Sequence, residues 1–216
     1  MARLFSSLQR LERNSAVITG YPYTIAAWVY DDGTSTNFPF LVGCSTSGTT
    51  AAGTRLQLYI DDLGKFSSGV GAVAANSTVA RTANTWAHGC GVHASATSHA
   101  AFLNGGSKGT NAATQAFPTG MNRTTINAWN GGANVGIAGN IAHCAIWNVA
   151  LADAEVLELA NGLLPTRIRP QSIISYWACN GRDSGEIDPY GRNDMTNYSS
   201  TVNANVPRIS MSSFIA

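Results

Sequence analysis

The sequence is poor in charge and poorer still in lysine. Charged side chains make up 12% of the 216 residues, and Lys65 and Lys108 are the only lysines, whereas roughly a quarter of an average soluble domain is charged. With a net charge of +1 and no basic cluster interleaved with aromatics, nucleic acid is not an expected partner. Ser, Thr, Asn, Ala and Gly replace the missing charge, which suits either contact with neighbouring subunits or a neutral polar monomer surface.

Long apolar runs are also missing. No segment reaches the roughly 18 apolar residues that a membrane-spanning helix needs, and the opening MARLFSSLQRLERN lacks the apolar core of a secretory signal. We therefore expect no membrane partner and synthesis in a cytoplasm. The four cysteines lie far apart, beside apolar runs and without a C-x-x-C pair, which predicts buried free thiols and leaves pairing in space open; they are Cys44, Cys90, Cys144 and Cys179.

What the chain does contain is a series of short alternating runs bounded by Gly, Asn, Asp and Pro, the pattern of an all-β protein. Asn104-Gly105 predicts a tight hairpin turn, because this pair readily supplies positive φ angles. Strands are predicted at Tyr23–Tyr30, Phe38–Gly43, Arg55–Ile60, Lys65–Val70, Trp86–His93, Ser98–Leu103, Thr124–Trp129, Ile141–Val149 and Ile173–Ala178.

One short helix is predicted near residues 151–161, where LADAEVLELA precedes Asn161-Gly162 and then Pro165. Many strands with one helix indicate a two-sheet sandwich or jelly roll. We expect a single domain over residues 1–216, since all-β sandwiches of roughly this length commonly form one domain. Residues 1–20 and 197–216 are expected to be arms or edge strands.

Three segments in order resemble the laminin-G-like, concanavalin A-like jelly-roll family. They are YPYTIAAWVY at 21–30, NTWAHGCGVHASATSHAAFLNGG at 84–106 with a W-x-H strand and a Leu-Asn-Gly turn, and GNIAHCAIWNVALADAEVLELANG at 139–162. The resemblance implies an antiparallel jelly-roll sandwich. Residues 168–196 are similar to a further strand of the group that comes early in many relatives and last here. A jelly roll tolerates this order, because its first and last strands lie side by side.

The start of the chain and this last piece look like proteins encoded by tailed bacteriophages. That resemblance implies a non-enzymatic virion protein made in the host cytoplasm, either a capsid decoration or cement protein or a tail-associated one. Its expected partners are the major capsid or tail protein and further copies of itself, as a homo-oligomer such as a trimer. The alternative is a carbohydrate-binding, lectin-like module directed at host surface glycans, because this fold serves both uses.

Catalysis is not expected. Glycosidases of this fold use two carboxylates on one strand face, and the four glutamates here are Glu12, Glu155, Glu158 and Glu186. Two of them lie on the predicted helix, and the single E-x-D, Glu186-Ile187-Asp188, runs into Pro189. No catalytic residue and no cofactor is therefore predicted.

A tetrahedral metal site is not expected at His88, Cys90 and His93, because a strand turns the last of these to the opposite face. Calcium is the metal to consider, since relatives with this fold bind it through Asp side chains at the rim. The candidate ligands are Asp31, Asp32, Asp61 and Asp62, each at a predicted strand end. The competing interpretation is that these residues form turns, which Asp favours.

A glycan site needs exposed aromatic side chains with amides or acids beside them. Trp28, Trp86, Trp147 and Trp177 lie within predicted strands and are assigned to the core. Trp129 with Asn130, beside a Gly-Gly loop, and Tyr190 are the predicted glycan-binding residues.

Overall fold

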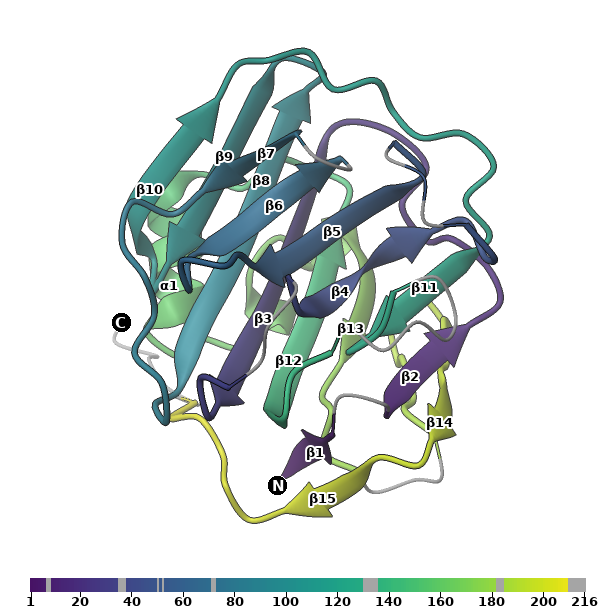
Figure 1. Cartoon of the computed structure of the whole chain (residues 1–216), viewed down its shortest axis with the longest axis vertical. Helices are drawn as coiled ribbons and strands as arrows, with labels where there is room; N and C mark the ends of the chain where they lie inside the picture. The colour runs from purple at the N-terminus through teal and green to yellow at the C-terminus, as the bar shows by residue number, and fades with distance from the viewer. Residues whose placement is uncertain are drawn as a thin grey trace.

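Two antiparallel sheets face each other in the computed structural model (Figure 1), which describes residues 1–6, 9–34, 38–49, 51, 53–70, 73–129, 136–181 and 185–209. The eight-stranded sheet has the order β10 (Gly106–Asn111), β9 (Ser98–Leu103), β8 (Ala87–Ser95), β3 (Tyr23–Asp31), β12 (Gly139–Trp147), β1 (Ala2–Phe5), β15 (Thr201–Asn203), with β13 (Ile173–Trp177) also paired to β12. The seven-stranded sheet has the order β14 (Thr196–Tyr198), β2 (Arg10–Arg13), β11 (Arg123–Ile126), β4 (Phe40–Ser45), β5 (Arg55–Ile60), β6 (Phe66–Val70), β7 (Val73–Asn76). The predicted all-β jelly-roll sandwich is confirmed.

The main core lies between the sheets because each strand turns alternate side chains inward. On β3, Ile25 and Val29 enter this core, while Ala26 and Trp28 point to the outer face. Each fully buried side chain of this size contributes about 1.5–3 kcal/mol. The outer face of the eight-stranded sheet is apolar as well, and it therefore needs a cover.

That cover is α1 (Asp153–Ala160), followed by two 3₁₀ turns, η1 (Pro165–Arg167) and η2 (Pro170–Ser172). Val156 and Leu159 of α1 pack with Trp147 of β12, whose indole Nε1 donates to the Ile168 carbonyl at 2.8 Å. The predicted helix is confirmed, although it begins at Asp153 because Ala152 is extended. No described helix has the length and apolar character to cross a membrane.

Backbone groups at both ends of helix α1 form hydrogen bonds with residues close by in the sequence. The Glu155 carboxylate accepts the Ala152 N–H at 2.7 Å, which occupies one of the unpaired donors of the first turn. At the other end Gly162, at φ 94°, donates to Leu159 O and Leu163 donates to Glu158 O, both at 3.0 Å. This is a Schellman ending, which favours glycine because L side chains avoid positive φ.

Strands lie near both ends of the described chain, and the last of them, β15, ends at Asn203. β1 and β2 place the N-terminal segment in both sheets, and β15 pairs with β1 while β14 pairs with β2. Arg3 of β1 forms a buried ion pair with Glu186, in the segment that precedes β14. Its Nε lies 3.0 Å from Glu186 Oε2. The first and last parts of the domain therefore close the sandwich together.

The four cysteines are buried free thiols, as predicted. Cys144 on β12 and Cys179 beyond β13 face the main core, with their sulfurs 4.0 Å apart. Burial raises the pKa of the Cys179 thiol, so this thiol stays protonated and acts as apolar packing at neutral pH.

The Asn104-Gly105 turn between β9 and β10 lies close against helix α1. Gly105 has φ 72°, and a Cβ there would lie 2.7 Å from the Leu157 Cα of helix α1. We expect Gly105→Ala to lower the free energy of unfolding by about 1–3 kcal/mol, from strain at positive φ and displacement of α1. Gly106→Ala is the control, since a Cβ at Gly106 meets nothing within 4 Å. Equal urea midpoints for the two variants would contradict this account.

Candidate functional site

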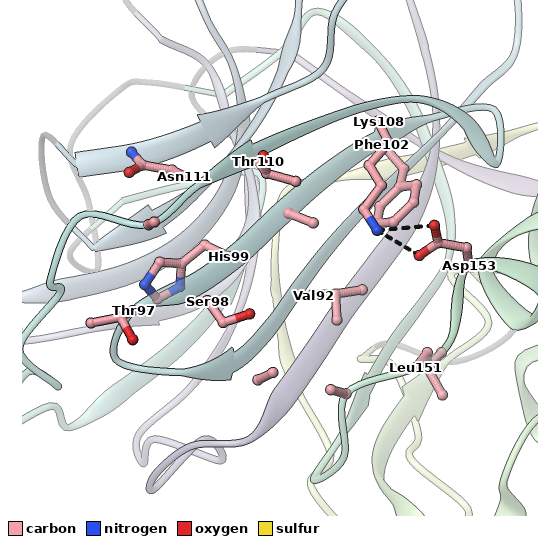
Figure 2. A pocket seen from close by; sticks show the side chains of 14 residues that line it. Val92, Thr97, Ser98, His99, Phe102, Lys108, Thr110, Asn111, Leu151 and Asp153 are labelled. Atoms are coloured by element: carbon pink, nitrogen blue, oxygen red, sulfur yellow. Dashed lines mark hydrogen bonds and ion pairs between the residues drawn. The ribbon is translucent and has the colours of Figure 1, made fainter.

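A hollow of about 300 Å³ lies on the outer face of the eight-stranded sheet, over β8, β9 and β10 and beside the start of α1 (Figure 2). We call it the β9 pocket. Lys108 and Asp153 lie at one end, and Thr97 and His99 lie at the other. Its lining is Val92, Ala94, Thr97, Ser98, His99, Ala100, Phe102, Lys108, Thr110, Asn111, Ala112, Ala150, Leu151 and Asp153.

The hollow exists because small side chains follow one another across the three strands. Val92 of β8 is in register with Ala100 of β9, which is in register with Thr110 of β10. Ala94 and Ala112 extend this row of small side chains, which forms the floor of the pocket. Because these side chains are short, they leave a hollow beside the part of the outer face that α1 covers. The exposed hydroxyls of Ser98 and Thr110 border the floor. The result is an apolar base edged by neutral hydrogen-bonding groups.

The charges in the pocket balance. Lys108 Nζ lies 2.8 and 2.9 Å from the two carboxylate oxygens of Asp153, which joins β10 to the first turn of α1. The two side chains are 40% and 63% exposed, and a pair this open is worth about 0–1 kcal/mol to stability. The pair can therefore offer a ligand both a donor and an acceptor, and the fold does not depend on it.

A buried histidine pair stands behind the pocket. His93 and His99 face each other on β8 and β9 with their Nδ1 atoms 2.8 Å apart. The His99 Nε2–H donates to Ala96 O at 3.0 Å, and the Ser68 hydroxyl donates to Gln57 O at 3.0 Å, because carbonyls only accept. Ser68 then accepts from His93 Nε2–H at 2.8 Å. The two rings make three contacts that each need a ring proton: with Ala96 O, with Ser68 Oγ and between the two Nδ1 atoms. Two neutral imidazoles carry only two such protons, so a neutral pair satisfies two of the three contacts.

The surroundings keep His93 neutral. Its ring stacks on Tyr23 at a centroid distance of 4.4 Å. Burial and the neighbouring His99 lower the pKa of His93 to about 3. Burial also lowers the pKa of His88 to about 3. His93, which lies behind the pocket, is therefore uncharged at neutral pH.

The predicted glycan-binding residues lie outside the β9 pocket. Trp129 follows β11 and is half-buried, and the Arg55 guanidinium lies over its ring, 3.9 Å from the centroid. Tyr190 is 46% exposed, and its ring makes a T-shaped contact with the Tyr176 ring. Asn130 lies outside the described residues. The assignment of Trp28, Trp147 and Trp177 to buried positions is confirmed, while Trp86 is half-buried. A glycan role for Trp129 and Tyr190 stays a prediction.

Two of the four predicted calcium ligands, Asp31 and Asp61, are engaged by contacts within the chain, whereas Asp32 and Asp62 are exposed. Arg81 Nε donates to Asp31 Oδ1 at 2.7 Å, and its guanidinium also reaches Gly64 O in the turn that follows Asp61 and Asp62. Asp61 Oδ1 accepts the Leu63 and Lys65 N–H groups, which makes it a turn former. Arg81 thus brings positive charge to the place where calcium was predicted. In the described ranges no three His, Cys, Asp or Glu side chains group as metal ligands.

The E-x-D acids also serve the fold. Glu186 pairs with Arg3, and Asp188 is buried with Oδ1 accepting the N–H groups of Tyr176, Tyr190 and Gly191. Glu12 of β2 pairs with Arg10 and Arg123. These carboxylates are committed to structural contacts.

The residues that sequence reasoning missed are Ser98, Lys108, Thr110 and Asp153. The strand β10 (GSKGTN) has no apolar side chain and so no alternating signal, although the preceding Asn-Gly turn pointed to a partner for β9. Asp153 was assigned to the helix start alone. No sequence pattern shows that it meets Lys108, 45 positions away.

Fold and pocket together define a lectin-type β-sandwich with a small neutral hollow on one sheet. The sequence profile described as the concanavalin A-like lectin/glucanases superfamily matches residues 7–157, and the chain belongs to this family. A search of curated proteins finds no significant match.

Solved structures share the fold. A candidate carbohydrate-binding protein from Bacteroides ovatus superposes with a TM-score of 0.67 at 16% identity, over 98% of this chain and 61% of that one. The present chain therefore spans about three fifths of that protein. The heptameric SAP-like pentraxin of Limulus polyphemus gives 0.54 at 16% identity, over 71% and 76% of the two chains. Domain 4 of the arabinanase AbnA from Geobacillus stearothermophilus, solved with arabinotriose, gives 0.51 at 14% identity, over 68% and 71%.

Proposed function

We propose that this protein is a non-enzymatic carbohydrate-binding module that holds a neutral sugar in the β9 pocket. The observation that carries the proposal is the composition of that pocket, an alanine-rich floor edged by hydroxyls and one internally balanced ion pair. Sugar rings present apolar C–H faces together with hydroxyls that both donate and accept, which such a lining matches. The expected ligand is neutral, because Lys108 and Asp153 already compensate each other.

The volume and the neighbours support the same proposal. At about 300 Å³ the pocket lies at the small end of ligand sites, which suits a single ring or the end of a chain. Among proteins of this fold, one is described as a candidate carbohydrate binder and another was solved with an arabinose trisaccharide. The proposed mode needs no calcium, since Asp153, the one carboxylate among the pocket's described lining residues, already has both oxygens on Lys108.

The test is binding of neutral glycans, first on a glycan array and then by calorimetry. We expect Asp153→Ala to weaken the best ligand by about tenfold or more, the usual loss for a hydrogen bond to a charged group. Thr110→Val should also weaken it. Glu158→Ala is the matched control, because it removes an exposed carboxylate from the same helix outside the pocket.

Two results would refute the proposal. One is an array without signal both in the presence of calcium and in its absence. The other is a bound glycan whose affinity is unchanged by Asp153→Ala and Thr110→Val.

The role as a virion structural protein, and the homo-oligomer that goes with it, stays a separate hypothesis. Its support is the charge-poor composition and the resemblance of the chain's two ends to phage proteins. The solved neighbours favour sugar binding instead. Light scattering of the purified chain tests the hypothesis: a monomer at all concentrations would remove it, and a closed oligomer would sustain it.

A further inference from the structure

A second hollow lies at the rim of the eight-stranded sheet, where β3 ends and β12 begins. Its base is a row of outward side chains from three adjacent strands. Leu4 of β1 is in register with Asn140 of β12, which is in register with Tyr30 of β3. The Tyr30 ring continues the row to the Trp86 ring, with the centroids 5.8 Å apart. This rim pocket is a cavity of about 490 Å³, larger than the β9 pocket.

The walls of the rim pocket are polar. Asn205 forms one wall and is held in place because its Oδ1 accepts the Trp86 Nε1–H at 2.9 Å. Ser6 and Asp32 border the opening, and both are exposed. An aromatic face, two amides, a hydroxyl and a carboxylate therefore converge on one cavity. These are groups from four separate segments of the chain, and the fold brings them together.

The charge of the rim pocket is not balanced, unlike that of the β9 pocket. Asp32 is the only charged side chain among its described lining residues. The hydrogen bonds that Asp32 Oδ1 accepts from the Thr34 hydroxyl and N–H, at 2.7 and 2.9 Å, lower the pKa of this carboxyl. The nearby Arg81 is engaged with Asp31. A negative charge therefore remains at the opening, beside an aromatic ring.

We propose that the rim pocket binds a protonated amine carried on a compact saturated ring, as in an amino sugar whose amino group is free. The ammonium group pairs with the Asp32 carboxylate as a charge-assisted hydrogen bond. The Tyr30 face attracts the cation and packs against the C–H groups beside it. Asn140, Asn205 and Ser6 supply amide and hydroxyl partners for ring hydroxyls. This site is separate from the β9 pocket, and its ligand differs from the neutral sugar proposed there.

The experiment compares glucosamine, N-acetylglucosamine and glucose by calorimetry with the full chain, slightly below neutral pH so that the amine is protonated. We expect glucosamine to bind at least about tenfold more tightly than the other two sugars. Asp32→Asn should remove this preference. The substitution keeps an Oδ1 acceptor for Thr34, so the turn stays formed. Asp62→Asn, an exposed carboxylate outside the cavity, should leave the preference unchanged.

Two further measurements show which pocket binds the amine and whether the sugar ring contributes to binding. Asp153→Ala must leave the preference for glucosamine over the other two sugars unchanged; if it abolishes this preference, the cation is bound in the β9 pocket and the proposal is wrong. Ethanolamine, an amine without a ring, should bind more weakly than glucosamine. Equal affinity for glucosamine and N-acetylglucosamine, or a preference that survives in Asp32→Asn, would overturn the proposal. Neutral-sugar binding tests the β9 pocket independently.

Discussion

Acidification from about pH 7 to about pH 5 should remove about 4 kcal/mol from the free energy of unfolding, through His88 and His93 alone. Burial holds the pKa of each near 3 in the folded chain, whereas an unfolded histidine titrates near about 6.5. The unfolded state therefore takes up protons first, and stability falls as the pH drops below the unfolded value. Each histidine loses about 1.36 kcal/mol per pH unit, or about 2 kcal/mol at pH 5.

This loss is large beside the total stability of a domain, which is commonly about 5–15 kcal/mol. The environment of His88 makes the penalty hard to avoid, because its buried Nδ1 has no hydrogen-bond partner in the described parts of the chain. His143, partly buried with its pKa lowered to about 4, steepens the same slope.

Urea unfolding at a series of pH values measures the effect, with the pH slope as the readout. His88→Gln and His93→Gln should each remove about half of the slope that the pair contributes. Glutamine at position 93 keeps an amide donor for Ser68. A slope that is unchanged in the double variant would show that other groups govern acid stability.

Replacing Arg3 by methionine should lower the free energy of unfolding by about 3–5 kcal/mol, because it leaves the Glu186 carboxylate buried without its cation. Arg3 and Glu186 are 2% and 4% exposed, and the Arg3 guanidinium also donates to Gly185 O and Ser200 Oγ. The pair joins β1 to the segment that leads into β14 and β15.

The double variant, Arg3→Met with Glu186→Leu, supplies the control. Since apolar pairs of similar volume often replace buried ion pairs at little cost, it should be more stable than Arg3→Met alone. Thermal unfolding and hydrogen exchange of β15 measure both stability and fraying. If the double variant is the less stable of the two, the destabilisation comes from lost packing around Arg3 rather than from the uncompensated charge.

Much of the fold could be predicted because its strongest signals are local. RLQLYI alternates clearly, SHAAFL ends at an Asn-Gly turn, and the strands Arg55–Ile60 and Ser98–Leu103 match their predicted bounds. The N-terminal Met1–Gly20 segment was ambiguous, since its apolar residues are irregularly spaced, and it contains two strands in different sheets. β7 and β10 were missed, because VAAN is short and GSKGTN carries no apolar side chain. The pairing of these two strands depends on the adjacent strands β6 and β9 rather than on an apolar pattern of their own.

The candidate sites were harder to predict, because each depends on distant residues meeting. Asp31 was correctly placed at a strand end, but its partner Arg81 comes fifty positions later. Trp129 beside a glycine loop suggested an exposed platform, and the Arg55 side chain covers it from another strand. The rim pocket joins β1, β3, β12 and the chain after β15. Sequence periodicity shows which face a side chain takes but not which strand lies beside it.

The central position of β3 has a consequence for how the chain folds during synthesis. One edge of β3 pairs with β8, but the other pairs with β12, where Ile25 meets Ile146 more than a hundred residues later. At roughly 5–20 residues per second, several seconds separate the emergence of these strands from the ribosome. During that interval the unpaired backbone N–H and C=O groups on this edge of β3 are open to other chains. Pairing over such separations is also slow, so we expect the yield of native protein to depend strongly on temperature and chaperone supply during expression.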